Sequence, residues 1–360
     1  MTRPIALCYG TRPQVIKASV LRRALAEAGP VVAIDTGQHY DYALNQLLYD
    51  QLGVAAPDHC LEVGSASHAT QTAGILMRAE ALYASLSPRA VVVIGDTNST
   101  LGCAIAATKL RIPVVHVEAG LRAHDALMAE EINRRVVDAI ATLLCTPSAA
   151  ATARMRAEHP GALVAETGDV ARDVLLAQVD QLPPPAAGAP QGVYAFATLH
   201  RAELTDEPAR LVAVLDALAA LPLPVLLAMH PRTRAALEGS GHPVGDRGAL
   251  TIVPAVGYLE SLALTSRARL VITDSGGVQR EAYWLGVPCI TMRTETEWTE
   301  TVELGANRLH APDAAGSLAA AVEERLASPR TWDRDAYGAG DAARRVAAAM
   351  ERLLAGEAAR

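Results

Sequence analysis

The 360-residue chain is long enough for two domains, each with a core of its own. Its formal net charge of −7 makes non-specific binding to nucleic acid unexpected. No apolar run reaches the roughly 18 residues needed to cross a bilayer, and the initial MTRPIALCYGTRP enters a predicted strand without a signal-peptide pattern. The cysteines at 8, 60, 103, 145 and 289 are dispersed without metal-type spacing, so we expect reduced, buried thiols in a cytoplasmic protein.

Short apolar strands alternate with amphipathic helices along nearly the whole chain. The first half predicts strands at 5–9, 31–35, 90–94, 114–117 and 143–146, and helices at 15–28, 69–85, 99–110 and 130–140. The second half predicts strands at 194–198, 225–229, 250–253, 270–273 and 289–292, and helices at 208–220 and 342–355. This alternation is typical of parallel sheets that are covered by helices on both faces.

A Pro/Gly-rich segment near the middle, LPPPAAGAPQG at 182–192, divides the pattern into two halves. We therefore predict an α/β protein with two Rossmann-like, doubly wound domains that face a central cleft. The predicted boundaries are an N-terminal domain at 1–175, a linker at 176–192, a C-terminal domain at 193–341, and a helix within 342–360 that packs back on the first domain. Ligands of such sheets bind at the carboxyl ends of the strands.

Basic residues follow the first predicted strand, in GTRPQVIK. Pro13 suits the first turn of a helix, and Arg12 and Lys17 bring two cations to that helix start. Cations there oppose the helix dipole and cost stability unless an anion is bound. An anion site is one interpretation, and solvated basic residues are the alternative.

Three carboxylates are predicted at one edge of the first sheet. Asp96 in GDTNST and Glu118 in HVEAGLR follow strands, and Glu130 in AEEINR opens a helix. Each could merely cap or stabilise a helix start. Carboxylates that converge on one cleft instead shift one another's pKa values, as proton transfer requires. A metal cluster is not expected, because no His/Cys grouping completes it.

The second half contains a phosphate-binding pattern, TDSGGVQREA. Ser275, Gly276 and Gly277 join a strand to a helix, so their backbone N–H groups are expected to face phosphate oxygens. Glu281, one turn later, is placed to accept hydrogen bonds from a ribose diol. The alternative is an ordinary capped turn. His200 and His230 also follow predicted strands, each beside an arginine, which indicates anion contact or acid/base chemistry unless both are structural.

Together these motifs resemble the UDP-N-acetylglucosamine 2-epimerase family. Nine of them occur in the family's order: GTRPQVIK, DTGQHYD, GDTNST, HVEAGLR, AEEINR, TLHR, HPRT, TDSGGVQREA and TETEWTE. The resemblance implies a glycosyltransferase-B-like fold, no metal and no cofactor. It also implies loss of the C2 proton with anti elimination of UDP, a 2-acetamidoglucal intermediate, and re-addition of UDP with reprotonation from the opposite face.

By motif position, the resemblance gives catalytic roles to Asp96, Glu118, Glu130 and His200, the last contacting the departing phosphate. It assigns binding of the substrate or UDP to Arg12, Lys17, Arg134, His230, Ser275, Gly276, Gly277, Glu281 and Arg293. It leaves Gln38, His39, Glu131 and Glu297 as contacts to the sugar or to an activating second UDP-sugar. The resemblance further implies a homodimer and a role in making sugars for polysaccharides.

The motifs also depart from the family pattern. The proline in Thr11-Arg12-Pro13 favours the non-hydrolysing branch, whereas Gln14 stands where glutamate is commoner. Thr296-Glu297-Trp298 is more similar to relatives that act on modified UDP-sugars, such as 2,3-diacetamido uronates or deoxy-aminohexoses. Two other functions stay open on these residues: glycosyl transfer from a sugar diphosphate to a base or alcohol, and a non-catalytic nucleotide-sugar sensor.

Overall fold

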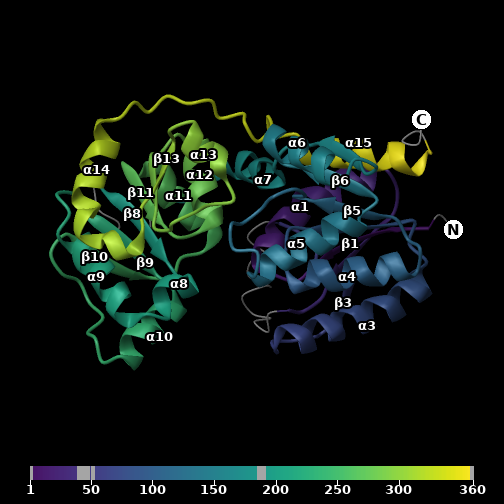
Figure 1. The fold of residues 1–360 in the computed structure, drawn as a ribbon, viewed down its shortest axis with the longest axis horizontal. Helices are drawn as coiled ribbons and strands as arrows, with labels where there is room; N and C mark the ends of the chain where they lie inside the picture. The colour runs from purple at the N-terminus through teal and green to yellow at the C-terminus, as the bar shows by residue number, and fades with distance from the viewer. Residues whose placement is uncertain (1–2, 39–48, 50–52, 185–191, 357–360) are drawn as a thin grey trace. The chain divides into compact units, whose positions relative to one another are not determined.

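The computed structural model describes residues 3–38, 49, 53–184 and 192–356. The chain forms two compact units (Figure 1): unit 1 is Met1–Ala177 with Asp335–Arg360, and unit 2 is Gln178–Arg334. Among the helices of the described residues, none combines the length and apolar character that a membrane crossing requires.

Unit 1 is built on a parallel sheet of seven strands in the order β3-β2-β1-β4-β5-β6-β7. The strands are β1 (Ile5–Tyr9), β2 (Val31–Asp35), β3 (His59–Cys60), β4 (Ala90–Ile94), β5 (Val114–Val117), β6 (Leu143–Thr146) and β7 (Leu163–Glu166). Its helices are α1 (Arg12–Glu27), α3 (His68–Leu86), α4 (Asn98–Lys109), α5 (Ala129–Ile140), α6 (Ala149–Glu158), α7 (Val170–Gln178, which ends at the unit boundary) and α15 (Ala342–Leu354).

Unit 2 repeats this plan with six parallel strands in the order β10-β9-β8-β11-β12-β13. The strands are β8 (Ala195–Leu199), β9 (Val225–Met229), β10 (Leu250–Pro254), β11 (Leu270–Thr273), β12 (Cys289–Thr291) and β13 (Asn307–Leu309). The helical segments are η1 (Val179–Gln181), α8 (Ala202–Thr205), α9 (Pro208–Ala219), α10 (Pro231–Gly239), α11 (Tyr258–Arg267), α12 (Gly276–Leu285), α13 (Thr299–Glu303), η2 (Pro312–Ser317) and α14 (Leu318–Ala327).

Successive side chains of a strand point to opposite faces of the sheet, which explains why helices cover both faces of each sheet. In unit 2, Ala195, Ala197 and Leu199 belong to a buried cluster with residues of α9 and α14. Phe196, between them, belongs to a cluster on the other face with residues of α11 and α12. Because both faces are buried, the strands are apolar at nearly every position, which is the continuous pattern expected of a parallel sheet.

The strand order creates a switch point in each sheet. The first strand of each unit has neighbours on both sides, β2 and β4 around β1, and β9 and β11 around β8. Connections leave in opposite directions from such a pair, which opens a crevice at the carboxyl ends of β1 and β4, and of β8 and β11. The motifs singled out in the sequence follow these strands.

The predicted fold class, two Rossmann-like α/β domains, is confirmed. The strands missing from the prediction are β3, β7 and β13, with only two to four residues each. One thiol differs from the expectation of burial: Cys60 is exposed, since it lies on β3 at the edge of the sheet, whereas the other four cysteines are buried, and all five are free.

The unit boundaries differ from those predicted by a few residues. The chain returns to unit 1 at Asp335, before the expected 342, because Arg172 forms an ion pair with Asp335 and the Asp169 N–H donates to the Tyr337 carbonyl. Helix α15 then packs on α1. The expected linker at 176–192 begins within α7, and its residues 185–191 lie outside the described residues.

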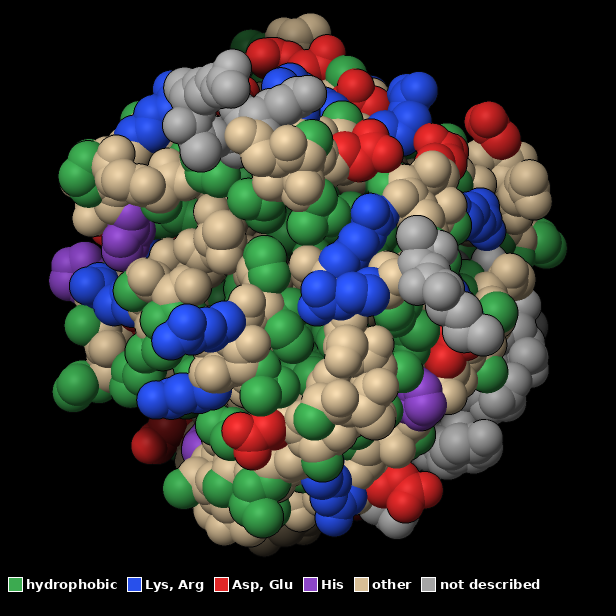
Figure 2. All heavy atoms as spheres, turned by 90° about the vertical axis from the view of Figure 1, so that its right-hand side faces the viewer, with side chains coloured by type: hydrophobic (Ala, Val, Ile, Leu, Met, Phe, Trp, Pro, Cys, Tyr) green, Lys and Arg blue, Asp and Glu red, His purple; other side chains and the backbone are tan. Residues whose placement is uncertain are grey.

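The surface mixes side chains of every kind. On the face drawn in Figure 2, Lys and Arg are scattered among apolar, acidic and polar groups. Unit 1 exposes several large apolar side chains, with Leu127 at 85%, Met77 at 67% and Ile132 at 46%. Exposed apolar groups of this size are candidates for contact with another molecule.

The start of α15 supplies a stability test of the returning segment. The Asp173 carboxylate accepts hydrogen bonds from the N–H groups of Ala342 and Ala343, at 3.1 and 2.7 Å. Asp173→Ala leaves both donors unsatisfied, so we expect the free energy of unfolding to fall by about 1–2 kcal/mol in urea titrations. Asp180→Ala, at an exposed site, is the control and should stay within about 0.5 kcal/mol of the parent. Equal stability of the two variants would show that Asp173 does not anchor α15.

Candidate active site

The loop after β1 brings Arg12 to the switch point of unit 1. A side chain at Gly10 would lie 2.0 Å from Thr36 Oγ1 and 2.2 Å from Ser99 Oγ, so only glycine fits there. Arg12 is the first residue of α1, and its exposed guanidinium has no hydrogen-bond or ion-pair partner among the residues that the structure describes. An unpaired cation at a helix start, where the dipole opposes it, suits a site for an anion.

Gln14 ties this loop to the loop after β4. Its Oε1 accepts from the N–H groups of Gly10 and Thr11, at 2.9 and 3.2 Å, and its Nε2 donates to the Ile94 carbonyl at 2.6 Å. A glutamate could accept the first two hydrogen bonds but could not donate the third. Gln14 therefore makes a contact that the glutamate expected here from the sequence resemblance could not make.

Each carbonyl of the turn after β4 accepts a hydrogen bond from a side chain of another element, and the Ile94 carbonyl also accepts from the Thr100 hydroxyl at 2.7 Å. Gln14 donates to Ile94, His116 Nε2 lies 2.8 Å from the Gly95 carbonyl oxygen, and Asn133 Nδ2 donates to the Asp96 carbonyl at 2.8 Å. The Asp96 carboxylate, part-exposed, pairs with Arg134 at 2.5 Å. These contacts come from α1, β5 and α5, so the position of Asp96 is fixed by three different elements.

Glu118 has a strained backbone and a buried side chain. Its φ of +68° lies in the left-handed region, which is costly for a residue with a side chain and is often found at functional sites. Both carboxylate oxygens bond to Lys17 Nζ, at 2.7 and 2.6 Å. A side chain at Gly95, whose φ is +64°, would come within 3.1 Å of Glu118 Oε2. The Gly95 turn and Glu118 therefore occupy adjoining space at the ends of β4 and β5.

Behind Glu118, His116 is fully buried and carries a positive charge. Its Nδ1 lies 2.7 Å from Asp138 Oδ1, and its Nε2 faces the Gly95 carbonyl, so both ring nitrogens must donate. Asp138 also pairs with Arg122 at 2.6 Å. Burial opposes the charge on His116, but the hydrogen bond and charge of Asp138 outweigh it and raise the pKa of His116. The same partners hold the pKa of Asp138 below its ordinary value in spite of its burial.

A pocket of about 340 Å³ opens at this edge of unit 1. Asp96 and Glu130 both line it, and Glu130 is exposed with no hydrogen bond or ion pair to any residue in the described part of the chain. Most of its other walls are amides, hydroxyls and imidazole, from Gln38, Ser65, His68, Gln71, Thr97, Asn98 and Asn133. Such groups hydrogen-bond to hydroxyl and acetamido groups. Two carboxylates in a pocket of this kind can transfer protons to and from a bound sugar.

Three candidates for sugar contact have different surroundings. Glu131 is wholly buried and accepts hydrogen bonds from Ala123 N–H, Arg134 and Arg135, so it orients Arg134 within unit 1. Gln38 is also buried, and its Oε1 accepts from the Ser99 hydroxyl at 2.6 Å while the residue lines the pocket. His39 lies outside the described residues.

In unit 2, Asp274 organises the loop after β8. Its Oδ2 accepts from the N–H groups of His200 and Arg201, at 2.7 and 2.8 Å, and its Oδ1 lies 3.2 Å from His200 Nδ1. Burial opposes ionisation, but His200 and the two N–H groups hold the pKa of Asp274 below its ordinary value. The His230 ring lies 5.2 Å from the His200 ring, so the two imidazoles adjoin at the ends of β8 and β9. His200 is thus oriented by a carboxylate at the switch point.

The start of α12 has the geometry of an anion site. Ser275 caps the helix, accepting from the Val278 N–H, and Gly276 and Gly277 are its first two residues. A side chain at Gly277 would lie 3.9 Å from Glu281 Oε1, so the Glu281 carboxylate sits over this first turn. Burial raises the pKa of Glu281 to about 7, against the opposing effect of Arg280. The helix dipole and free N–H groups favour a phosphate here.

The Thr-Glu-Trp segment packs against the same turn. Trp298 lies under the Arg280 guanidinium, 3.7 Å from ring centroid to Cζ, and its Nε1 would be 3.4 Å from a side chain at Gly276. Arg293 and Glu297 are buried and form an ion pair at 3.0 Å. These two charges therefore stabilise the segment, and Arg293 does not present a free guanidinium to solvent.

Sequence reasoning assigned no role to His116, Asp138, Arg122 or Asp274. His116 and Arg122 belong to the HVEAGLR motif, and Asp274 precedes Ser275 in the phosphate-type turn, so the motifs themselves contained that signal. Asp138 gives no such signal, because it lies in the last turn of a helix that looks amphipathic. Only the fold brings it to His116 from 22 residues away.

Two Rossmann-like units, each with polar side chains at its switch point, define an enzyme of the nucleotide-sugar class. A sequence profile described as UDP-N-acetylglucosamine 2-epimerase matches residues 23–351. The chain belongs to this family, whose members are nucleotide-sugar 2-epimerases.

Similar proteins cover nearly the whole chain. A UDP-2,3-diacetamido-2,3-dideoxy-D-glucuronate 2-epimerase from Pseudomonas aeruginosa is 39% identical over 97% of this chain and 99% of its own. A UDP-N-acetylglucosamine 2-epimerase from Methanocaldococcus jannaschii is 36% identical over 95% and 97%. The crystal structure of the M. jannaschii UDP-GlcNAc 2-epimerase in complex with UDP-GlcNAc and UDP matches with a TM-score of 0.86, 34% identity, and coverage of 98% and 99%. The predicted family is confirmed.

The charge on His116 makes stability depend on pH. Its pKa is raised in the folded protein, so its contribution to stability is complete below about pH 6.5 and is lost as the pH rises through the folded-state pKa. We expect His116→Gln to lower the free energy of unfolding by about 2–3 kcal/mol at pH 6 and by less at pH 9, measured by urea titration. The control is His242→Gln at an exposed site. A loss that is the same at both pH values would show that His116 is neutral.

Proposed function

We propose that this protein interconverts a UDP-linked 2-acetamido sugar and its C2 epimer. The observation that carries the proposal is the pocket at the switch point of unit 1, which is lined by Asp96 and Glu130 and by amide and hydroxyl groups. The family assignment supports the same reaction. The chain is 39% identical to an epimerase of a UDP-diacetamido-uronate and 36% identical to an epimerase of UDP-N-acetylglucosamine. These identities support UDP-linked 2-acetamido sugars as the substrate class, but they do not single out one sugar.

The proposed reaction begins with cleavage of the bond between C1 and the UDP oxygen, which takes the electron pair. Positive charge at C1 makes the C2 proton acidic, and its removal forms the C1–C2 double bond of a 2-acetamidoglucal. Groups that stabilise the departing diphosphate lower this barrier. We assign that role to the first turn of α12 with Ser275, to His200 held by Asp274, and to Arg12, which has no partner among the described residues.

The return step adds a proton to the opposite face of C2 as the UDP oxygen attacks C1, so no cofactor or net oxidation is needed. Removal and delivery on opposite faces need at least two proton-transfer groups. We assign them to Asp96, Glu118 and Glu130. Asp96 is held by Arg134 and Glu118 by Lys17, so these two carboxylates are positioned, whereas Glu130 is free to move with its exposed side chain.

The remaining expectations also stand as proposals. We assign the ribose contact to Glu281 and a diphosphate contact to His230. Gln38 is assigned to sugar binding, while Arg293, Glu297 and Glu131 support their loops through internal ion pairs. A homodimer is supported by the exposed apolar side chains of unit 1, Ile132 and Val136 on α5 among them. Five free cysteines support a cytoplasmic protein, and we also assign it to the supply of sugars for polysaccharides.

Solvent exchange tests the reaction directly. In deuterated buffer with UDP-N-acetylglucosamine or a UDP-2,3-diacetamido uronate, we expect deuterium at C2 and appearance of the C2 epimer, followed by NMR. Deuterium enters because the abstracted proton exchanges with solvent before return. Absence of exchange with either sugar, together with a glycoside product when an alcohol is added, would favour glycosyl transfer and overturn the proposal.

The Glu118→Gln variant separates catalysis from binding in the same assay. We expect turnover to fall at least about 1,000-fold, because the amide cannot accept the proton, while UDP affinity changes by less than about threefold. Glu166→Gln, on the edge strand β7, is the matched control and should keep full turnover. Unchanged turnover of Glu118→Gln would remove Glu118 from the proposed mechanism.

The raised pKa of Glu281 predicts how UDP binding depends on pH. The ionised carboxylate accepts two hydrogen bonds from a ribose diol, whereas the protonated form accepts fewer, so affinity should rise as the pH passes about 7. We expect calorimetry to show about tenfold tighter UDP binding at pH 8 than at pH 6. The β-phosphate of UDP titrates in the same range, and the Glu281→Gln variant measures that contribution alone. A pH dependence equal to that of Glu281→Gln would contradict the ribose contact.

A further inference from the structure

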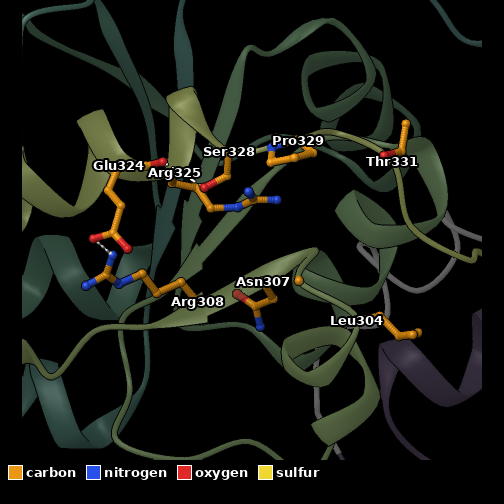
Figure 3. Close-up of a pocket in the computed structure, with 9 residues that line it drawn as sticks. Leu304, Asn307, Arg308, Glu324, Arg325, Ser328, Pro329 and Thr331 are labelled. Carbon is orange, nitrogen blue, oxygen red and sulfur yellow. Dashed lines mark hydrogen bonds and ion pairs between the residues drawn. The ribbon is translucent and has the colours of Figure 1, made fainter.

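A second pocket, of about 360 Å³, lies in unit 2 away from the phosphate-type turn (Figure 3). Its lining begins with Leu304 and Gly305, which precede β13, and ends with Ser328 to Thr331, which follow α14. The residues before a strand mark its amino end, and Ser275 follows the carboxyl end of β11. In a parallel sheet these ends are opposite, so this pocket is separate from the candidate active site.

The pocket contains a buried cation without an acidic partner. Arg325 is 5% exposed, and Figure 3 shows its guanidinium reaching into the space between Ser328, Pro329 and Asn307. Its Nη2 donates a hydrogen bond to the Ala306 carbonyl at 3.2 Å, and its buried Nε has no hydrogen-bond partner in the described part of the chain. No Asp or Glu of the described residues forms an ion pair with it. A buried charge that is left unpaired is costly.

Neighbouring groups offset only part of the charge on Arg325. The one acid in the lining, Glu324, is paired with Arg308, as the dashed line in Figure 3 marks. Arg325 lies in the last turn of α14, where the helix dipole compensates part of one charge. The Trp332 ring, 5.6 Å from Arg325 Cζ, adds a weak cation–π contact. A net positive charge therefore remains in the pocket.

More arginines lie nearby. Burial lowers the pKa of Arg325, and the charge on Arg330 adds to this effect. Arg330 is exposed, and partial desolvation together with the charges of Arg269 and Arg334 lowers its pKa. Of these arginines, Arg325 lines the pocket, and an anion bound there would stabilise its charge.

We propose that this pocket binds a phosphate dianion, either free or carried by a small phosphate monoester. The planar guanidinium of Arg325 offers paired donors that match phosphate oxygens, Arg308 provides a second cation, and Thr331 a hydroxyl. The volume exceeds that of a bare phosphate, and Leu304 and Pro329 give the pocket apolar walls, so a monoester also fits.

Calorimetry on the full chain with saturating UDP tests the proposal, because UDP then occupies the other phosphate site. At constant ionic strength set with chloride, we titrate inorganic phosphate in one series and glucose 6-phosphate in another. We expect both to bind at pH 7.5, and tighter binding of the ester would identify a monoester as the preferred source. If neither inorganic phosphate nor glucose 6-phosphate binds, the proposal is overturned.

Variants assign the binding to this pocket. Arg325→Gln should weaken phosphate binding at least about tenfold, and Glu324→Gln should strengthen it about threefold, because it removes the competing acid from Arg308. The gain in Glu324→Gln cannot come from misfolding, so it remains decisive if Arg325→Gln fails to fold. Arg234→Gln on α10 is the matched control and should bind like the parent. UDP affinity should be unchanged in all variants, which distinguishes failure here from failure of the proposed epimerase activity. Parental phosphate affinity in both pocket variants would disprove the assignment.

Discussion

The turn at Ile94 to Asp96 is the constraint on which the candidate site of unit 1 depends. Each of its carbonyls receives a hydrogen bond from a side chain on a different element, through Gln14, His116 and Asn133. A side chain at Gly95 would be strained, because the φ of this residue is +64° and its Cβ would lie 3.1 Å from Glu118 Oε2. Asp96 and Glu118 are therefore placed by the same set of contacts, and neither can shift without breaking buried hydrogen bonds.

Buried charge maintains this arrangement. His116 is fully buried as a cation because Asp138 and the Gly95 carbonyl both accept its protons, and Arg122 in turn pairs with Asp138. Glu118 is buried with Lys17. Breaking a buried pair leaves an uncompensated charge, which costs far more than the pair contributes when intact. Such networks fix geometry, and proton transfer at a weakly acidic carbon needs fixed geometry.

In unit 2 a buried polar side chain likewise fixes a loop at the switch point, here beside the proposed diphosphate site. Asp274 follows β11 and accepts from two backbone N–H groups of the loop after β8, so it fixes that loop as Gln14 fixes the loop after β1. His200 is oriented by the same carboxylate, while Trp298 and Arg280 pack on the start of α12. At the amino ends of the same strands, Arg325 is buried and forms no ion pair with a described acidic residue, and an anion from solution is the compensation that we propose.

The local sequence pattern was enough to predict the longer strands and the fold class. Apolar runs mark the strands of a parallel sheet, and glycine-containing turns mark the loops that follow them. It also placed Asp96, Glu118 and Ser275 at strand ends, since the end of an apolar run marks the carboxyl edge of a sheet. Short edge strands such as β13 were not predicted, because three residues are too few to show a hydrophobic pattern.

Pairing was decided by tertiary structure alone. Glu131 and Glu130 are neighbours of the same type, yet one is wholly buried among arginines and the other lines the pocket, because the helix turns about 100° between them. Arg293 and Arg325 likewise look alike in sequence, but among the described residues Arg293 pairs with Glu297 whereas Arg325 forms no ion pair. The sequence determined which residue types reach the sheet edges; the packing of distant segments determined which charges are neutralised and which remain available to a ligand.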